Sequence, residues 1–176
     1  MARDAAEQSD LVRMCLLAKF GGIWADADDC LYGRLGTIMR GQKGLVVYRE
    51  PSGGALGNNF MAAPANHPAV LTAAEIARQS LLRRDSEAAW NKTGPGVLTR
   101  AVGQYLQSCL EDGRAPELSV LDHAKVADCI HMHNHVRYKT SATYWEASLA
   151  RSYPFDLWTR LSEALGIETA SVHTAA

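Results

Sequence analysis

The sequence predicts an α/β fold, in which a mixed sheet carries helices on its faces. An amphipathic helix, a Gly21-Gly22 turn and a short apolar strand at 23–25 follow one another directly. Strand-like segments at 45–48 and 59–63 then precede further helical segments. Acidic residues also come immediately after the first strand, and open α/β sheets bind their ligands at the carboxyl ends of strands.

The composition indicates one globular domain. The chain has 176 residues, 47% of them hydrophobic, and a net charge of −1. The absence of a basic tract predicts no nucleic-acid partner. No apolar run reaches the ~20 residues that cross a bilayer, and the polar first residues do not form a signal peptide. We therefore predict a cytoplasmic protein with no transmembrane segment, and four reduced, mostly buried cysteines.

Local signals predict the bounds of the elements. Ser9 is a predicted helix N-cap, with Asp10 in the first turn, and Gly21-Gly22 ends that helix before a buried strand at 23–25. The other predictions are strands at 45–48, 59–63, 118–121 and 126–130 and helices at 67–84, 97–110 and 155–165. One catalytic domain is expected over residues 1–167, followed by a frayed tail at 168–176.

Asp26-Ala27-Asp28 forms a DXD pattern at the end of the first strand. Alternate strand residues face the same side, so the two carboxylates can converge on one point. Oxygen ligands of this kind suit Mg²⁺ or Mn²⁺. A haloacid-dehalogenase-like phosphatase fits poorly, because Gly21-Gly22 lies too close upstream and Cys30 replaces the expected Thr or Val. A calcium EF-hand also fails, because Leu31 stands where glycine is needed.

Asp10 and Arg13 lie three residues apart on the first helix and therefore share a face. A guanidinium at that position can hold a phosphate or sugar hydroxyls, and Asp10 can accept hydrogen bonds from a sugar. A salt bridge within the helix is the structural alternative.

The run from Ser9-Asp10 through Arg13 to Gly21-Gly22-Ile23-Trp24 and Asp26-Ala27-Asp28 closely resembles the DXD sugar-transferase family. That family includes capsular-polysaccharide enzymes, fungal initiating mannosyltransferases and the related clostridial toxin glucosyltransferase domains. The resemblance implies a GT-A-like fold and hexose transfer with retention of configuration. It also implies that Asp10 and Arg13 bind the donor sugar, and that Asp26 and Asp28 are the catalytic residues that hold Mn²⁺ or Mg²⁺.

Weaker resemblance continues to about residue 100. Asn58-Asn59 before Pro64, and the Thr93-Gly94-Pro95 turn, look like later elements of the same family. By that similarity, Asn58, Asn59 and Gly94 would lie near the donor or the acceptor.

His131, His133 and His135 alternate and would share one face of a strand. Three interpretations stay open: a solvated edge, a separate zinc site, or a single further ligand to the DXD ion of the kind that many GT-A enzymes add. For the last we assign His133. Family members often carry His-Trp near this point, where this chain has Tyr144-Trp145.

Only eight residues precede Ser9, whereas the resembled enzymes carry an earlier segment that cradles the nucleobase. We therefore expect a domain that is incomplete at its N-terminus, with an exposed sheet edge that favours self-association. The predicted reaction moves a hexose from a nucleoside-diphosphate sugar to a hydroxyl of a glycan, a lipid-linked acceptor or a protein. The alternative is an inactive remnant that binds a sugar or a partner.

Overall fold

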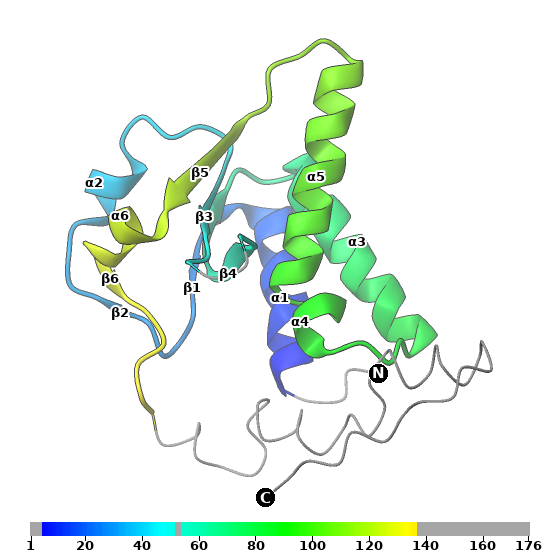
Figure 1. Ribbon diagram of the computed structural model, residues 1–176, viewed down its shortest axis with the longest axis horizontal. Coiled ribbons are helices and arrows are strands. Elements are labelled where there is room, and N and C mark those ends of the chain that lie inside the picture. The colour runs from blue at the N-terminus through cyan, green and yellow to red at the C-terminus, as the bar shows by residue number, and fades with distance from the viewer. Residues whose placement is uncertain (1–4, 52–53, 137–176) are drawn as a thin grey trace, which may run out of the picture.

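The computed structural model describes residues 5–51 and 54–136. Its helices are α1 (Ala5–Phe20), α2 (Leu35–Met39), α3 (Pro68–Arg83), α4 (Ala89–Lys92), α5 (Pro95–Glu111) and α6 (His123–Ala127). Its strands are β1 (Gly22–Ala25), β2 (Cys30–Leu31), β3 (Leu45–Arg49), β4 (Leu56–Ala63), β5 (Leu118–Asp122) and β6 (Ile130–His131). Figure 1 shows the long helices gathered beside the sheet.

The main sheet has the strand order β1-β4-β3-β5. The β1–β4 and β3–β4 pairs are antiparallel, whereas β3 and β5 run parallel. A second, two-stranded sheet pairs β2 with β6. The mixed α/β architecture predicted from the sequence is therefore confirmed.

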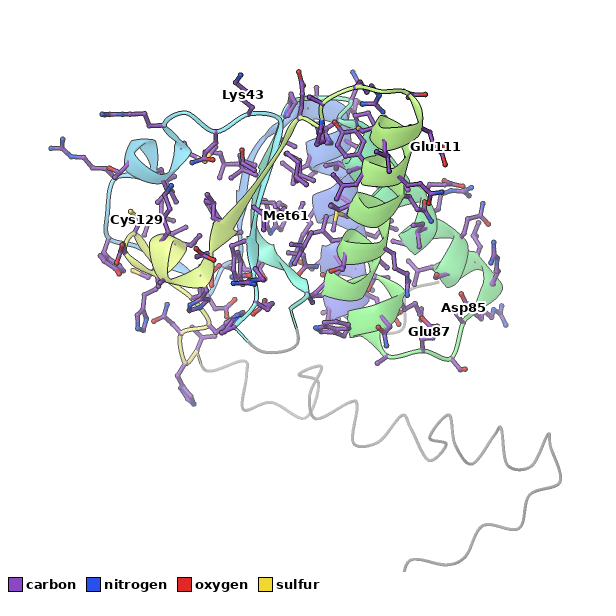
Figure 2. All side chains as sticks on the ribbon, turned by 45° about the horizontal axis from the view of Figure 1, so that its top comes forward. Lys43, Met61, Asp85, Glu87, Glu111 and Cys129 are labelled. Carbon is purple, nitrogen blue, oxygen red and sulfur yellow. The ribbon has the colours of Figure 1, made fainter. Side chains whose placement is uncertain are left out.

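Helices cover both faces of the main sheet, and each face has its own core (Figure 1). Residues of α1, α3 and α5 pack on one face, which we call the long-helix face. Residues of α2, α6 and β6 pack on the other, which we call the short-helix face. Figure 2 labels Met61 on the long-helix face and Cys129 on the opposite side.

The alternation of side chains holds in β3 but breaks in β4. Between the pairs Val46–Ala62 and Tyr48–Gly57 the register shifts, so that Val47 alone stands opposite the β4 segment 58–61. A bulge of this kind re-aims side chains. As a result, Asn58 contacts α1 on the long-helix face, while Asn59 contacts Tyr48 on the short-helix face.

The first helix begins earlier than predicted. It starts at Ala5, so Ser9 lies inside α1 and the N-cap prediction is wrong. Ala, Glu and Gln are good helix formers, and the buried ion pair between Glu7 and Lys92 ties this extra turn to α4. The predicted end is confirmed, because Gly21 follows Phe20 at φ +66°.

The predicted helix start near Pro68 is confirmed, whereas α5 begins at Pro95, before the predicted start at 97, because proline suits the first turn of a helix. Two strand predictions also need correction. The strand at 23–25 exists as β1, yet it is an edge strand, with Ile23 48% exposed. The predicted strand at 126–130 is instead the end of α6 and the start of β6, because burying Val126 under the short-helix face favours a helical turn there.

The histidines do not form the alternating strand that was predicted. β6 contains only His131 among them, and His133 has a left-handed backbone with φ +57°. The four cysteines are free, but two of them, Cys15 and Cys30, are exposed, so burial was overestimated. In the described ranges no helix is long and apolar enough to span a bilayer. The predicted helix at 155–165, Tyr144-Trp145 and the tail at 168–176 lie outside the described residues.

Candidate functional site

Arg13 is the centre of a buried ionic network at the end of β1. Its side chain is 4% exposed. One terminal nitrogen donates to Asp26 Oδ1 at 2.7 Å, and the other donates to the Asn58 carbonyl oxygen at 2.6 Å. Asp10 lies 3.5 Å away within the same helix. The guanidinium therefore joins α1 to β4 and to the DXD segment, beyond the intrahelical salt bridge that spacing alone suggests.

Asp10 connects this network to the turn before α5. Its carboxylate accepts hydrogen bonds from Asn58 Nδ2 at 2.9 Å and from Thr93 Oγ1 at 3.0 Å. A Cβ on Gly94 would lie 3.2 Å from Asp10 Oδ2, closer than ordinary contact. Glycine at this position therefore allows the turn to approach the carboxylate.

Burial opposes ionisation of both carboxylates in the network. Loss of solvent raises the pKa of Asp10, while Arg13 and the hydrogen bonds from Thr93 and Asn58 act in the opposite direction. Burial likewise raises the pKa of Asp26 against the influence of Arg13. The network thus holds carboxylates whose charge depends on the guanidinium between them.

Trp24 has a polar role in addition to its packing. Its Nε1 donates to Asp26 Oδ1 at 2.7 Å, and the Arg13 guanidinium carbon lies 5.4 Å from the ring centroid. Trp24 therefore belongs to this polar network as well as packing against the core. Both bonds to Asp26 end on Oδ1, and no described side chain donates to Oδ2.

A second group lies beside this network and contains Asp28, Asp29 and His133. One ligand atom from each lies within 4.8 Å of the others. Asp28 and His133 are residues that the sequence assigns to a metal site. Asp26, the third residue that the sequence assigns to the metal, is not in this group and is bonded to Arg13, whereas Asp29 lies with Asp28 and His133. The signal for Asp29 is its position as the last acid of the run from Asp26.

Hydrogen bonds orient Asp29 on both of its oxygens. Asn59 Nδ2 donates to Oδ2 at 2.8 Å, and the His133 backbone N–H donates to Oδ1 at 3.0 Å. Asn134 also donates to the Asp28 carbonyl oxygen through its backbone and side chain, at 3.0 and 2.8 Å. The segment after β6 is thereby fastened to the loop after β1, although about a hundred residues separate them in the chain.

The donor set of this group fits a divalent cation. Carboxylates suit Mg²⁺ and Mn²⁺, whereas an imidazole ligand suits transition metals, so the combination favours Mn²⁺ over Mg²⁺. A carboxylate oxygen has two lone pairs, and Asp29 can therefore bind an ion while accepting its hydrogen bonds. A separate zinc site of three histidines does not form among the described residues, because only His133 belongs to a group of possible ligands.

Every residue that the sequence assigns to the site belongs to one of the two groups or lies against one. Asn58 and Asn59 point in opposite directions from β4, the first to Asp10 and the second to Asp29. Both asparagines are buried, with exposures of 6% and 3%. In this structure each asparagine is therefore a hydrogen-bond partner of a site carboxylate, Asp10 or Asp29.

Fold and site define a class: an α/β domain whose polar site lies where a sheet strand ends in an acidic loop. Residues 3–87 match the family model described as capsular polysaccharide synthesis protein. The match contains Asp10, Arg13 and the DXD segment, and it confirms the resemblance over these residues. No curated protein matches the chain.

One solved structure that matches is titled PaToxG Glycosyltransferase. The identity is 27% and the TM-score 0.49, over 61% of this chain and 39% of that chain. The matched region therefore spans about two fifths of that protein.

Proposed function

We propose that this chain is a glycosyltransferase domain that moves a hexose from a nucleoside-diphosphate sugar to a hydroxyl acceptor. The observation that carries the proposal is the adjacency of two groups, a carboxylate held by Arg13 and a metal-type group of Asp28, Asp29 and His133. The family match over residues 3–87 supports it, because that segment contains most of these side chains.

Asp28, Asp29 and His133 would hold Mn²⁺. The ion would offset charge on the departing diphosphate, which is the help that a nucleotide leaving group needs. Transfer breaks the bond between the anomeric carbon and the diphosphate oxygen. The diphosphate leaves with the bonding electron pair, and the acceptor oxygen bonds to that carbon while its proton passes to the departing diphosphate.

The buried network would position the donor. Arg13 and Trp24 hold Asp26 through hydrogen bonds to Oδ1. Its Oδ2 would then accept a hydrogen bond from a hydroxyl of the donor ribose or sugar. Asp10 and Arg13 would set the depth of the sugar pocket beside Gly94. The description of the matching family supports a polysaccharide acceptor. We propose transfer with retention of configuration, which only the resemblance to the DXD sugar-transferase family implies. Proton NMR of the first-formed anomer tests the stereochemistry.

A screen of nucleotide sugars with and without Mn²⁺ tests the proposal. Metal-dependent hydrolysis or transfer is expected for one donor, and Asp28→Asn should abolish it while the far-UV spectrum stays unchanged. Asp112→Asn is the matched control, because Asp112 follows α5 at the end opposite Gly94, near Glu111 in Figure 2. Binding of a sugar nucleotide without turnover would favour the inactive remnant, and activity that survives Asp28→Asn would refute the metal site.

A further inference from the structure

We propose that Tyr48 is a positioning residue for the metal group, acting through Asn59 on Asp29. The inference rests on the proposed function and adds to it a residue on a neighbouring strand. Tyr48 is fully buried in β3, and its hydroxyl proton is shared between two acceptors, Asn59 Oδ1 and, at 3.0 Å, Glu50 Oε1, with the bond to Asn59 the shorter. Asn59 in turn donates from Nδ2 to Asp29 Oδ2 at 2.8 Å. The three side chains form one continuous series of hydrogen bonds that ends at a proposed metal ligand.

The chemistry of the partners fixes the direction of this series. An ionised carboxylate only accepts hydrogen bonds, so the amide NH₂ of Asn59 must face Asp29. The amide oxygen then faces Tyr48, where a donor is required. The Tyr48 hydroxyl is therefore the group that holds the Asn59 amide in the orientation that Asp29 needs.

Surroundings keep the Tyr48 hydroxyl protonated and available as a donor. Burial, the charge of Glu50 and the hydrogen bond that Glu50 Oε1 accepts from the same hydroxyl at 3.0 Å together raise the pKa of Tyr48 above its ordinary value. The ring of His123 packs against the Tyr48 ring, with 5.9 Å between centroids. The phenol is thus confined on the short-helix face of the sheet.

Two backbone features of β4 make the contact possible. Gly57 stands opposite Tyr48 in the register, and a Cβ there would lie 2.2 Å from the tyrosine ring. The ring therefore occupies the space that a side chain at Gly57 would fill. The bulge between Gly57 and Ala62 then turns Asn59 toward the phenol and Asp29. The Asn59 amide is thus held by the Tyr48 hydroxyl, and this contact depends on both Gly57 and the bulge. We infer from this that Tyr48 positions the amide in addition to packing in the core.

Tyr48→Phe tests the proposal with Mn²⁺ as the probe. Electron paramagnetic resonance of free Mn²⁺ gives the dissociation constant without need of a sugar substrate. Partners that orient metal ligands typically contribute about 10–100-fold in affinity, and we expect a loss of about 10-fold. Tyr105→Phe is the matched control, because Tyr105 is also buried and its hydroxyl accepts a hydrogen bond from the Glu117 backbone on the long-helix face. That control should lower the melting temperature and leave the Mn²⁺ constant unchanged.

Asn59→Leu keeps the proposal testable if Tyr48→Phe folds poorly. It removes the link itself and should weaken Mn²⁺ binding at least as much. In the Asn59→Leu background, adding Tyr48→Phe should change the constant by less than about 2-fold, because Tyr48 then has no link through which to act. Additive losses, or a Tyr48→Phe constant equal to that of the unmodified chain, would overturn the positioning role alone. Failure of the unmodified chain to bind Mn²⁺ would overturn the metal-dependent function as well.

Discussion

The two halves of the site are built in different ways. In the network of Asp10, Arg13 and Asp26, the first two residues are buried and Asp26 is partly buried. The network joins α1, β4 and the turn before α5 through side chains. The group of Asp28, Asp29 and His133 lies nearer the surface and is assembled by hydrogen bonds between two loops. The first half is therefore part of the core that holds the fold together. The second is a set of possible metal ligands nearer the surface.

Mutations in the first half should therefore lower mainly the free energy of unfolding, and mutations in the second half mainly the affinity for Mn²⁺. Removing one member of a buried ion pair leaves an uncompensated charge, which costs about 3–5 kcal/mol. Removing a half-buried carboxylate costs less, about 1–3 kcal/mol, because its hydrogen-bond donors lose one partner. The predictions below test this separation, beginning with the largest effect.

Arg13→Met should lower the free energy of unfolding by about 3–5 kcal/mol, because Asp10 and Asp26 lose their common cation inside the protein. Urea denaturation followed by circular dichroism measures it. Arg49→Met is the control, since the Arg49–Asp122 pair is exposed, at 63% and 79%, and should contribute at most about 1 kcal/mol. Equal losses in the two variants would contradict the division between a buried half and a half nearer the surface.

Asp29→Ala should have the opposite profile. It removes a proposed ligand, so Mn²⁺ affinity should fall by more than about 10-fold. The free energy of unfolding should fall by only about 1–3 kcal/mol, because Asn59 Nδ2 loses its acceptor. Paramagnetic resonance and urea denaturation on the same samples give both quantities. A large loss of stability with unchanged Mn²⁺ binding would assign Asp29 to the core.

Thr93→Val should lower the free energy of unfolding by about 1–3 kcal/mol, since the fully buried hydroxyl donates to Asp10 and valine keeps its shape. Thr72→Val on α3 is a matched control, because it makes the same exchange on a partly exposed helix position away from the site. A Thr93→Val protein as stable as this control would indicate that Asp10 does not depend on the hydroxyl.

How far the sequence predicts this site follows from which contacts are local. The Asp10 and Arg13 spacing, the Gly21-Gly22 turn and the position of the DXD segment are local, and the structure contains all of them. Which of Asp26 and Asp29 lies with Asp28 and His133 does not follow from local sequence. It depends on a turn in which the Asp29 N–H donates to the Asp26 carbonyl oxygen. It also depends on the contact with His133, which is distant in the sequence.

The bulge in β4 shows the same limit. A regular strand would place Asn59 on the same face as Met61, yet Asn59 bonds to Tyr48 on the opposite face. The residues of 56–63 do not by themselves predict this change of face, because it results from the shifted pairing with β3. The role of Tyr48 therefore becomes visible only when both strands are in place.

The smallest predicted effect is a pH dependence that separates buried from exposed carboxylates. The folded pKa of Asp10 is raised above 3.8, so between that value and the raised pKa the folded state binds more protons than the unfolded state. The contribution of Asp10 to stability is therefore fully present below about pH 3.8 and declines as the pH rises through that window. The free energy of unfolding of the unmodified chain, minus that of Asp10→Asn, should accordingly fall as the pH rises.

Glu75 gives the opposite sign and so completes the test. Hydrogen bonds from Arg78 and Gln79 lower the pKa of this exposed carboxyl from 4.5 to about 2. Its contribution is present above about pH 4.5 and is lost as the pH falls toward 2. The same difference measured with Glu75→Gln should therefore rise with pH, and by little, because the group is fully exposed to solvent. Urea denaturation at several pH values yields both slopes. If the Asp10 slope had the sign of the Glu75 slope, the effect of Arg13 on the pKa of Asp10 would be larger than the effect of burial. The predicted difference between the buried and the exposed carboxylate would then be wrong.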